Sequence, residues 1–157
     1  MTPFPPPGLL PFRTNLWIAA RLMPMFTKRN DLEPLLLMAT PAAGTHAFDD
    51  LTADTIVAAV KAVVARPWRM RGRRCLREGL LAFHYLSLAG YAPLLHFGVV
   101  PQSLRGKKTA AHCWVSIDGE TMLNPPRRAM HELFVYDGQA SVPTGRPTLG
   151  EIADIHA

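Results

Sequence analysis

Two residue types that can carry nucleophilic catalysis stand where a fold could bring them together. Cys75 precedes a mostly apolar stretch that predicts a buried helix. A thiol at a helix N-terminus lies at the positive end of the helix dipole, beside unpaired backbone N–H groups that favour the thiolate. His112 follows in a strand-like segment, and an imidazole beside a thiol can accept its proton and later return it to a leaving group. The pair indicates cysteine-based catalysis if the two side chains meet.

Each of the two residues also has an ordinary structural interpretation. Cysteine is most often a small buried hydrophobic residue, and a single strand histidine is more often structural than catalytic. Three features favour a reactive Cys75: the neighbouring cations Arg73 and Arg74, its place in the first turn of the expected helix, and the apolar helix behind it. We therefore expect the thiol at the boundary between core and surface.

The strand that carries His112 presents two different faces. One face is small and apolar and is expected to pack on the core helix; it holds Ala111, Cys113, Val115 and Ile117. The other holds His112, Trp114 and Ser116, where Trp114 could shield the imidazole or simply pack. Arg73, Arg74 and Trp114 are the candidates for contact with a substrate. Because adjacent strand residues point to opposite faces, Cys75, His112 and Cys113 are not expected to share a metal ion, and we predict no metal site.

Length and charge fit one domain with a local basic patch. The chain has 157 residues, of which 48% are hydrophobic and 18% charged, which predicts a sizeable core. The net charge of +5 comes from five arginines, because the other 12 of the 17 basic residues balance the 12 acidic ones; the five are Arg66, Arg69, Arg71, Arg73 and Arg74. A local patch argues against general nucleic-acid binding, and two cysteines make no disulfide framework.

The chain start and one long uncharged stretch bear on location. The N-terminal residues lack a basic segment followed by an apolar run, so we expect no signal peptide. Residues 79–104 contain no Asp, Glu, Lys or Arg, but Gly90 and Pro93 interrupt them. A buried helix followed by a buried strand explains this stretch better than a membrane span. We therefore expect a soluble, cytoplasmic protein.

Hydrophobic periodicity predicts helices first and strands later. Helices are expected at 15–26, after a Thr14 or Asn15 cap, at 52–66 with Thr52 as cap, and at 75–89, closed by Gly90. Residues 32–38 could form a helix, a strand or a crossover. Strands are expected at 94–100, 110–117, 120–123 and 133–136, as an antiparallel meander. The predicted fold class is α+β, with the nucleophile-bearing helix packed on an antiparallel sheet.

We divide the single domain into four segments. Residues 1–14 form a proline-rich arm, 15–66 an N-terminal helical region, 67–140 the catalytic helix-plus-sheet core, and 141–157 a C-terminal tail. The first helix carries an apolar stripe of Leu16, Trp17, Ala20 and Met23. This stripe is expected to pack on the core, with a partner or membrane surface as the alternative.

The motifs resemble a known enzyme family. Residues 66–124 are similar to the transglutaminase-like, papain-related leader peptidases of lasso-peptide biosynthesis, on the motifs Cys75-Leu-Arg-Glu-Gly-Leu-Leu, Leu94-Leu-His-Phe-Gly-Val, the His112-Cys-Trp-Val-Ser-Ile-Asp-Gly strand and Met122-Leu-Asn. The resemblance implies a cysteine protease in which Cys75 attacks a peptide bond of the precursor and His112 is the base. It implies a separate leader-recognition protein, a cyclase that closes a macrolactam from the product, and no cofactor.

Two positions depart from the family pattern. Glu78 stands where a serine commonly follows the arginine, and Asn124 stands where the family has the Asp that orients the histidine. Asn can orient an imidazole through its side-chain oxygen, and Asp118 is the alternative third member. A three-residue hairpin loop, which pairs Ser116 with Glu120, would set Asn124 opposite His112. We expect that register because the resemblance requires it.

Three functions remain open from the sequence. The first is peptide cleavage, in which the basic segment stabilises the thiolate or receives acidic residues of the precursor. The second is acyl transfer to an amine through the same thioester. The third is a non-catalytic peptide-binding module in which Cys75 and His112 are structural.

Overall fold

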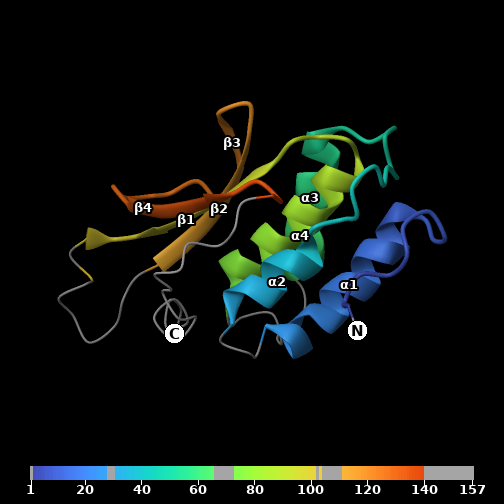
Figure 1. Ribbon diagram of the computed structural model, residues 1–157, viewed down its shortest axis with the longest axis horizontal. Helices are drawn as coiled ribbons and strands as arrows, with labels where there is room; N and C mark the ends of the chain where they lie inside the picture. The colour runs from blue at the N-terminus through green and yellow to red at the C-terminus, as the bar shows by residue number, and fades with distance from the viewer. Residues whose placement is uncertain (1, 28–30, 66–72, 102, 104–110, 140–157) are drawn as a thin grey trace.

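A computed structural model of the protein describes residues 2–27, 31–65, 73–101, 103 and 111–139. These residues form four helices and one four-stranded antiparallel sheet (Figure 1). The elements follow along the chain as α1 (Phe12–Phe26), α2 (Leu32–Ala39), α3 (Ala53–Ala65), α4 (Arg74–Leu88), β1 (Leu94–Val99), β2 (Ala111–Ile117), β3 (Glu120–Leu123) and β4 (His131–Tyr136). The α+β fold class is confirmed, and the open segment 32–38 is helical.

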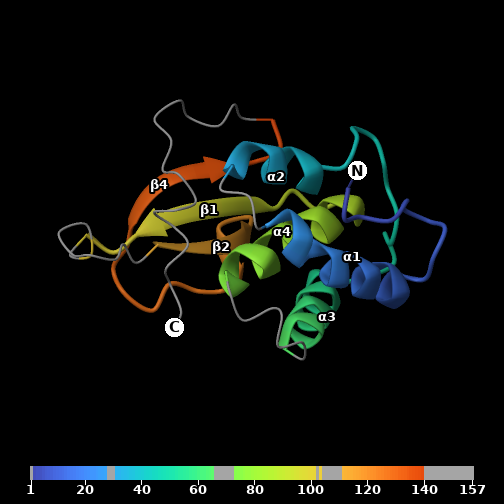
Figure 2. The same cartoon turned by 90° about the horizontal axis from the view of Figure 1, so that it is seen from below.

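The central helix α4 packs against β1, β2 and β3 of the sheet and against all three other helices (Figures 1 and 2). Nearly all of its residues are buried, as the apolar sequence on most sides of this segment predicts. The helix ends where expected: Gly90 adopts a φ of 83°, its N–H bonds to Ser87 O, and the N–H of Tyr91 bonds to Leu86 O. This paired-bond C-terminal motif satisfies carbonyls that the helix itself leaves free.

The sheet order is β3-β2-β1-β4, so the fourth strand does not extend the meander, and that part of the expectation is wrong. β4 pairs with the far edge of β1 instead. Its apolar side chains explain the placement: Phe134 stacks on Phe97 at 4.6 Å between ring centroids, and Tyr136 shares a 2.8 Å hydrogen bond with Thr40 at the end of α2. Beside β3 these aromatic rings would lose that contact with the core.

The N-terminal segment differs from the expectation. α1 begins at Phe12, with Pro11 before it, so Thr14 and Asn15 are not its cap. Asn15 is fully buried inside the helix, where its amide donates to Pro6 O at 3.2 Å and its side-chain oxygen accepts from Tyr85 at 2.6 Å. The chain before α1 is thereby tied to the core.

Other predicted features can be compared directly. Thr52 caps α3, since its hydroxyl accepts the Thr55 N–H at 3.3 Å. The uncharged stretch from Gly79 contributes to α4 and β1. Across the described ranges, no helix has the length and apolar character needed to span a membrane. The expected C-terminal tail, 141–157, and Arg66, Arg69 and Arg71 of the basic segment lie outside the described residues.

Candidate active site

Cys75 is the second residue of α4 and is partly exposed. The helix starts there because Arg73 turns the chain with a left-handed φ of 55°. Arg73 and Arg77 then fix this start against the end of α1: Arg73 Nη1 donates to Thr27 O at 2.6 Å, and Arg77 Nε donates to Thr27 Oγ1 at 3.0 Å. Cations at the last carbonyls of α1 suit the negative end of that helix. Cys75 therefore sits among the free N–H groups of a firmly placed first turn.

His112 on β2 meets this thiol. The Cys75 thiol and the His112 imidazole lie close enough for each to shift the pKa of the other. His112 Nε2 donates to the main-chain oxygen of Asn124 at 2.9 Å, which leaves Nδ1 as the ring nitrogen available to the sulfur. The structure thus brings together the two residues that the sequence singles out.

Asn124 does not orient His112 in the expected way. Ile117 pairs with Glu120 across a two-residue turn, in which Asp118 and Gly119 have φ values of 51° and 82°, so the three-residue loop is wrong. A bulge between Val115 and Ser116 then shifts the register further and pairs Val115 with Leu123. Asn124 is therefore not opposite His112 on a paired strand, and Asp118 occupies the turn.

The backbone of Asn124 makes the contact instead. β3 ends at Leu123, and Asn124 turns with a φ of 54°, a conformation that Asn tolerates better than most residues with a side chain. Its carbonyl accepts from His112, while its side-chain amide donates to Cys75 O at 3.4 Å. A neutral carbonyl fixes the tautomer and the orientation of the imidazole without adding a negative charge.

The pKa values of the two groups shift in opposite directions. Hydrogen bonds from Cys113 and then His112, with the charge of His112, lower the pKa of the Cys75 thiol well below its usual value, although burial opposes this. The hydrogen bond to Cys75 raises the pKa of His112; burial opposes this, the Asn124 carbonyl adds to it, and the charge of Arg127 reduces it. These directions favour a thiolate–imidazolium pair, which is the reactive form of a cysteine–histidine site.

The chain matches the transglutaminase-like superfamily over residues 15–135. It belongs to that superfamily. No curated protein and no solved structure matches the chain significantly. The matched range contains Cys75, His112 and Asn124. Transglutaminase-like proteins include both cysteine peptidases and acyl transferases, and both reactions use a thiol nucleophile with a histidine partner.

A second thiol contributes to this transglutaminase-like site, and the sequence did not predict it. Cys113 lies on the core face of β2 and is buried, with its Sγ packed beside Gly79 of α4, and it lowers the pKa of the Cys75 thiol. Burial raises the pKa of the Cys113 thiol well above its usual value, and its contact with Cys75 acts in the same direction. The raised pKa favours the protonated thiol of Cys113. The sequence interpretation placed Cys113 on the face opposite His112 and gave it no part in the site.

The three candidates for substrate contact lie near the dyad but are held by the protein itself. Trp114 is largely buried and stacks with His112 at 6.4 Å and with His96 at 5.1 Å between ring centroids. Arg74 Nε pairs with the buried carboxylate of Glu78 at 2.9 Å, one turn along α4. Arg73, as described, binds the end of α1. Arg74 keeps a half-exposed side chain beside Cys75.

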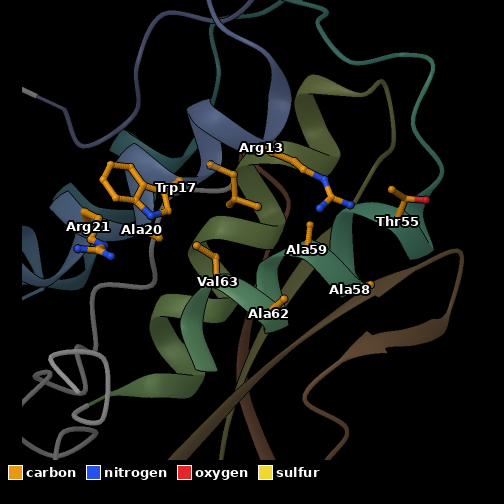
Figure 3. Close-up of a pocket in the computed structure, with 10 residues that line it drawn as sticks. Arg13, Trp17, Ala20, Arg21, Thr55, Ala58, Ala59, Ala62 and Val63 are labelled. Carbon is orange, nitrogen blue, oxygen red and sulfur yellow. The ribbon is translucent and has the colours of Figure 1, made fainter. Parts of the chain in front are cut away.

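Two further features were considered as parts of the active site: a metal-binding cluster and the groove between α1 and α3. Within the described part of the chain, no group of three or more His, Cys, Asp or Glu side chains could hold a metal ion. A groove of about 610 Å³ runs between α1 and α3 (Figure 3) and has no lining residue from α4 or the sheet. Leu16 and Ala20 of the apolar stripe are buried beside it, whereas Trp17 is half-exposed, with Arg21 at 4.5 Å from its ring centroid.

Proposed function

We propose that this transglutaminase-like protein is a cysteine peptidase that removes the leader from a lasso-peptide precursor. The proposal rests on the placement of Cys75 in the first turn of α4 near His112, whose Nε2 is fixed by the Asn124 carbonyl, with the thiol pKa lowered and the imidazole pKa raised. Superfamily membership supports a thiol enzyme. The motif resemblance over residues 66–124 supports the choice of substrate.

In the proposed reaction, the Cys75 thiolate attacks the carbonyl carbon of the scissile peptide bond. The His112 imidazolium then gives its proton to the leaving amine, and a thioester on Cys75 remains. Neutral His112 next takes a proton from water, which attacks the thioester and regenerates the thiol. Asn124 contributes by holding Nε2 of the imidazole, so that Nδ1 stays directed at the sulfur.

We propose that the precursor is presented by a separate leader-recognition protein and that a cyclase uses the released core peptide. Arg74 is the better placed of the two arginines to meet an acidic residue of the precursor, because half of its side chain is exposed beside Cys75. Its ion pair with Glu78 would then exchange for a bond to the peptide. Arg73 would hold the first turn of α4 in shape, and the Trp114 ring would form the side of the site next to the His112 imidazole.

Acyl transfer is the second candidate, because the superfamily contains acyl transferases as well as peptidases. Both reactions form the same thioester and differ only in whether water or an amine resolves it. A non-catalytic binding module has weaker support, since a structural cysteine does not require a lowered pKa.

The test is to incubate the protein with a candidate precursor and recognition protein and to follow peptide mass. We expect a leader and a core fragment, and we expect Cys75→Ala and His112→Ala to abolish both. His131→Ala is the matched control, because His131 is an exposed histidine on the same sheet. Addition of a primary amine separates the candidates: a transferase would give the amide in place of the free acid. Cleavage that persists undiminished in Cys75→Ala would overturn the proposed mechanism.

A further inference from the structure

The two cysteines of the chain lie 38 positions apart, at 75 and 113, yet both lie at the first turns of α4: Cys75 is in the helix, and Cys113 Sγ packs beside Gly79, one turn further on. Cys75 is partly exposed and Cys113 is buried, and neither forms a disulfide. In the proposed peptide cleavage Cys75 and His112 react with the substrate, and Cys113 only lowers the pKa of the Cys75 thiol. A second oxidisable sulfur beside the reactive one can also take part in redox chemistry.

The packing of β2 on α4 brings the two sulfurs together. Gly79 lies one helical turn after Cys75, on the same side of α4. A Cβ at Gly79 would lie 3.2 Å from Cys113 Sγ and 2.9 Å from Leu95 Cδ1. Only glycine leaves enough room there, so the strand approaches the helix closely and Cys113 Sγ lies directly against its first turns. Cys113 has no route to solvent of its own, because it is only 2% exposed.

We propose that Cys75 and Cys113 are a redox pair, in which Cys113 is the resolving thiol that converts peroxide-oxidised Cys75 into a reversible disulfide. The ligand class of this modification site is a hydroperoxide. The inference rests on the proposed function only in taking Cys75 as the reactive thiolate. The same thiolate is also open to oxidation, and the neighbouring Cys113 thiol protects it by forming a disulfide.

Hydrogen peroxide oxidises the two thiols to a disulfide in two steps. The Cys75 thiolate attacks one oxygen of hydrogen peroxide, the O–O bond breaks, and hydroxide leaves, takes up a proton and becomes water. Cys75 is then a sulfenic acid. The Cys113 sulfur attacks the sulfenic sulfur, the S–S bond forms, the S–O bond breaks, and the leaving hydroxide takes the Cys113 proton as a second water. One peroxide is reduced, two thiols are oxidised, and a dithiol reverses the change.

The different surroundings of the two sulfurs set their roles. Cys75 is accessible and lies at a helix N-terminus, so peroxide meets the thiolate there first. Cys113 is buried and protonated and does not react with peroxide from solution. It reacts only with an oxidised sulfur that is already in contact with it. Disulfide formation would block the nucleophile but stop further oxidation to the irreversible sulfinic and sulfonic acids.

The experiment treats the full chain with hydrogen peroxide, blocks free thiols with N-ethylmaleimide and measures intact mass and a peptide map. For the wild type we expect a species that has lost two hydrogens, carries no maleimide and contains a cross-link between the peptides of Cys75 and Cys113. Dithiothreitol should restore both thiols. In Cys113→Ala and Cys113→Ser, we expect Cys75 to gain two or three oxygen atoms instead, and dithiothreitol should not reverse this. Both substitutions are made at Cys113 because one of them could prevent folding. Circular dichroism shows which variant is folded, and the result is taken from that variant.

Two outcomes would overturn the inference. One is a wild type that accumulates sulfinic acid on Cys75 as fast as Cys113→Ala does. The other is a disulfide that links two copies of the chain, seen as a dimer on a non-reducing gel. Because the readout is mass and not peptide cleavage, it remains valid if the leader-peptidase proposal fails. If cleavage is observed, reversible loss and recovery of that activity should follow the disulfide.

Discussion

Two histidines on neighbouring strands flank the same tryptophan but have different partners. His112 on β2 contacts the Cys75 thiol and the Asn124 carbonyl. His96 on β1 lies opposite Trp114 in the strand register and is hydrogen-bonded at 2.7 Å to both Glu132 Oε2 and Ser116 Oγ. By its pattern, serine–histidine–glutamate, the His96 cluster looks the more complete catalytic triad.

The difference lies in the nucleophiles. Ser116 is only 4% exposed and lies within a strand, where no helix N-terminus lowers its pKa and no substrate carbonyl can approach it. Cys75 is partly exposed, lies in the first turn of a helix and has its pKa lowered by Cys113 and His112. The reactive site is therefore identified by an accessible and acidic nucleophile, and a chain of short hydrogen bonds is not sufficient to identify it. We interpret His96 as a structural residue that holds one side of Trp114.

The largest expected effect separates the two histidines in catalysis. His112→Ala should lower leader cleavage by about a thousandfold or more, because the thiolate and its base act as one unit. His96→Ala and Ser116→Ala should leave the rate within about tenfold of wild type and should instead lower stability by about 1–3 kcal/mol, through lost or unpaired buried polar groups. Cleavage rates and urea unfolding of all three variants measure this. Equal loss of activity in Ser116→Ala would mean that the His96 cluster belongs to the catalytic centre.

A third histidine, His84 in α4, forms no ion pair among the described residues. It is buried, stacks on Phe4 at 3.7 Å between ring centroids and is hydrogen-bonded through Nδ1 to Ala39 O at 3.0 Å, while its Nε2 has no hydrogen-bond partner in the described part of the chain. Burial lowers the pKa of His84 from 6.5 to about 4. Between these two pKa values the unfolded chain therefore binds a proton at His84 and the folded chain does not. The free energy of unfolding is unaffected by His84 above pH 6.5 and decreases as the pH falls toward 4.

The expected loss for His84 is at most about 3 kcal/mol over that range, since each pKa unit corresponds to about 1.4 kcal/mol. His84→Gln should remove this pH dependence, whereas the exposed His131→Gln should keep it. Urea unfolding at about pH 7 and about pH 4.5 measures the difference. A slope that is the same in wild type and His84→Gln would show that the proton binds elsewhere.

A substitution at Gly98 tests the role of the Trp114 ring, which lies between His96 and His112. A Cβ at this position would lie 3.0 Å from Trp114 Cζ3 and 3.1 Å from His131 O. Gly98→Ala should therefore displace the tryptophan, lower stability by about 1–3 kcal/mol and weaken cleavage less than His112→Ala does. Trp114→Phe in the Gly98→Ala background should recover part of the stability, because it removes the part of the ring that the methyl group meets. A double variant no more stable than Gly98→Ala would indicate that the clash is with the backbone of His131.

The sequence could predict most of the elements but only part of the site. Local signals are read from a few neighbouring residues, and so Thr52 as a cap, Gly90 as a helix end and Cys75 in a first turn are all found where expected. The three-residue loop was expected because the resemblance required it, whereas Asp118-Gly119 forms the two-residue turn that this dipeptide favours. The bulge between Val115 and Ser116, which shifts the register beyond the turn, has no signal in the neighbouring residues.

The contacts of Cys113 and Asn124 depend on how distant elements pack. Cys113 reaches Cys75 because Gly79 allows β2 to approach α4 closely, which only the assembled layers define. Asn124 was expected to act through its side chain, but its left-handed backbone turns the carbonyl to His112. A residue type indicates which side-chain chemistry is available and does not indicate that the main chain is used instead.

The smallest expected effect concerns the charge that acts on His112 from outside the dyad. Arg127 lies exposed in the connection between β3 and β4, and its charge lowers the pKa of His112 against the stronger effect of Cys75. A cysteine–histidine pair is active between the two pKa values: activity is lost as the pH falls through that of Cys75 and as it rises through that of His112. Arg127→Gln should therefore move only the alkaline limb, and move it upward.

Arg128→Gln is the matched control, because it removes the same charge from the adjacent exposed residue. The pH dependence of kcat/KM on a precursor measures both limbs, and that of Cys75 alkylation by iodoacetamide measures the acid limb alone. Because the Arg127 charge is exposed, added salt should bring wild type and Arg127→Gln together, as expected for charges screened over about 8 Å at physiological ionic strength. His96, whose partners are Glu132 and Ser116, should not influence either limb. An alkaline limb that moves equally in Arg128→Gln would assign the effect to overall charge and not to Arg127 beside the imidazole.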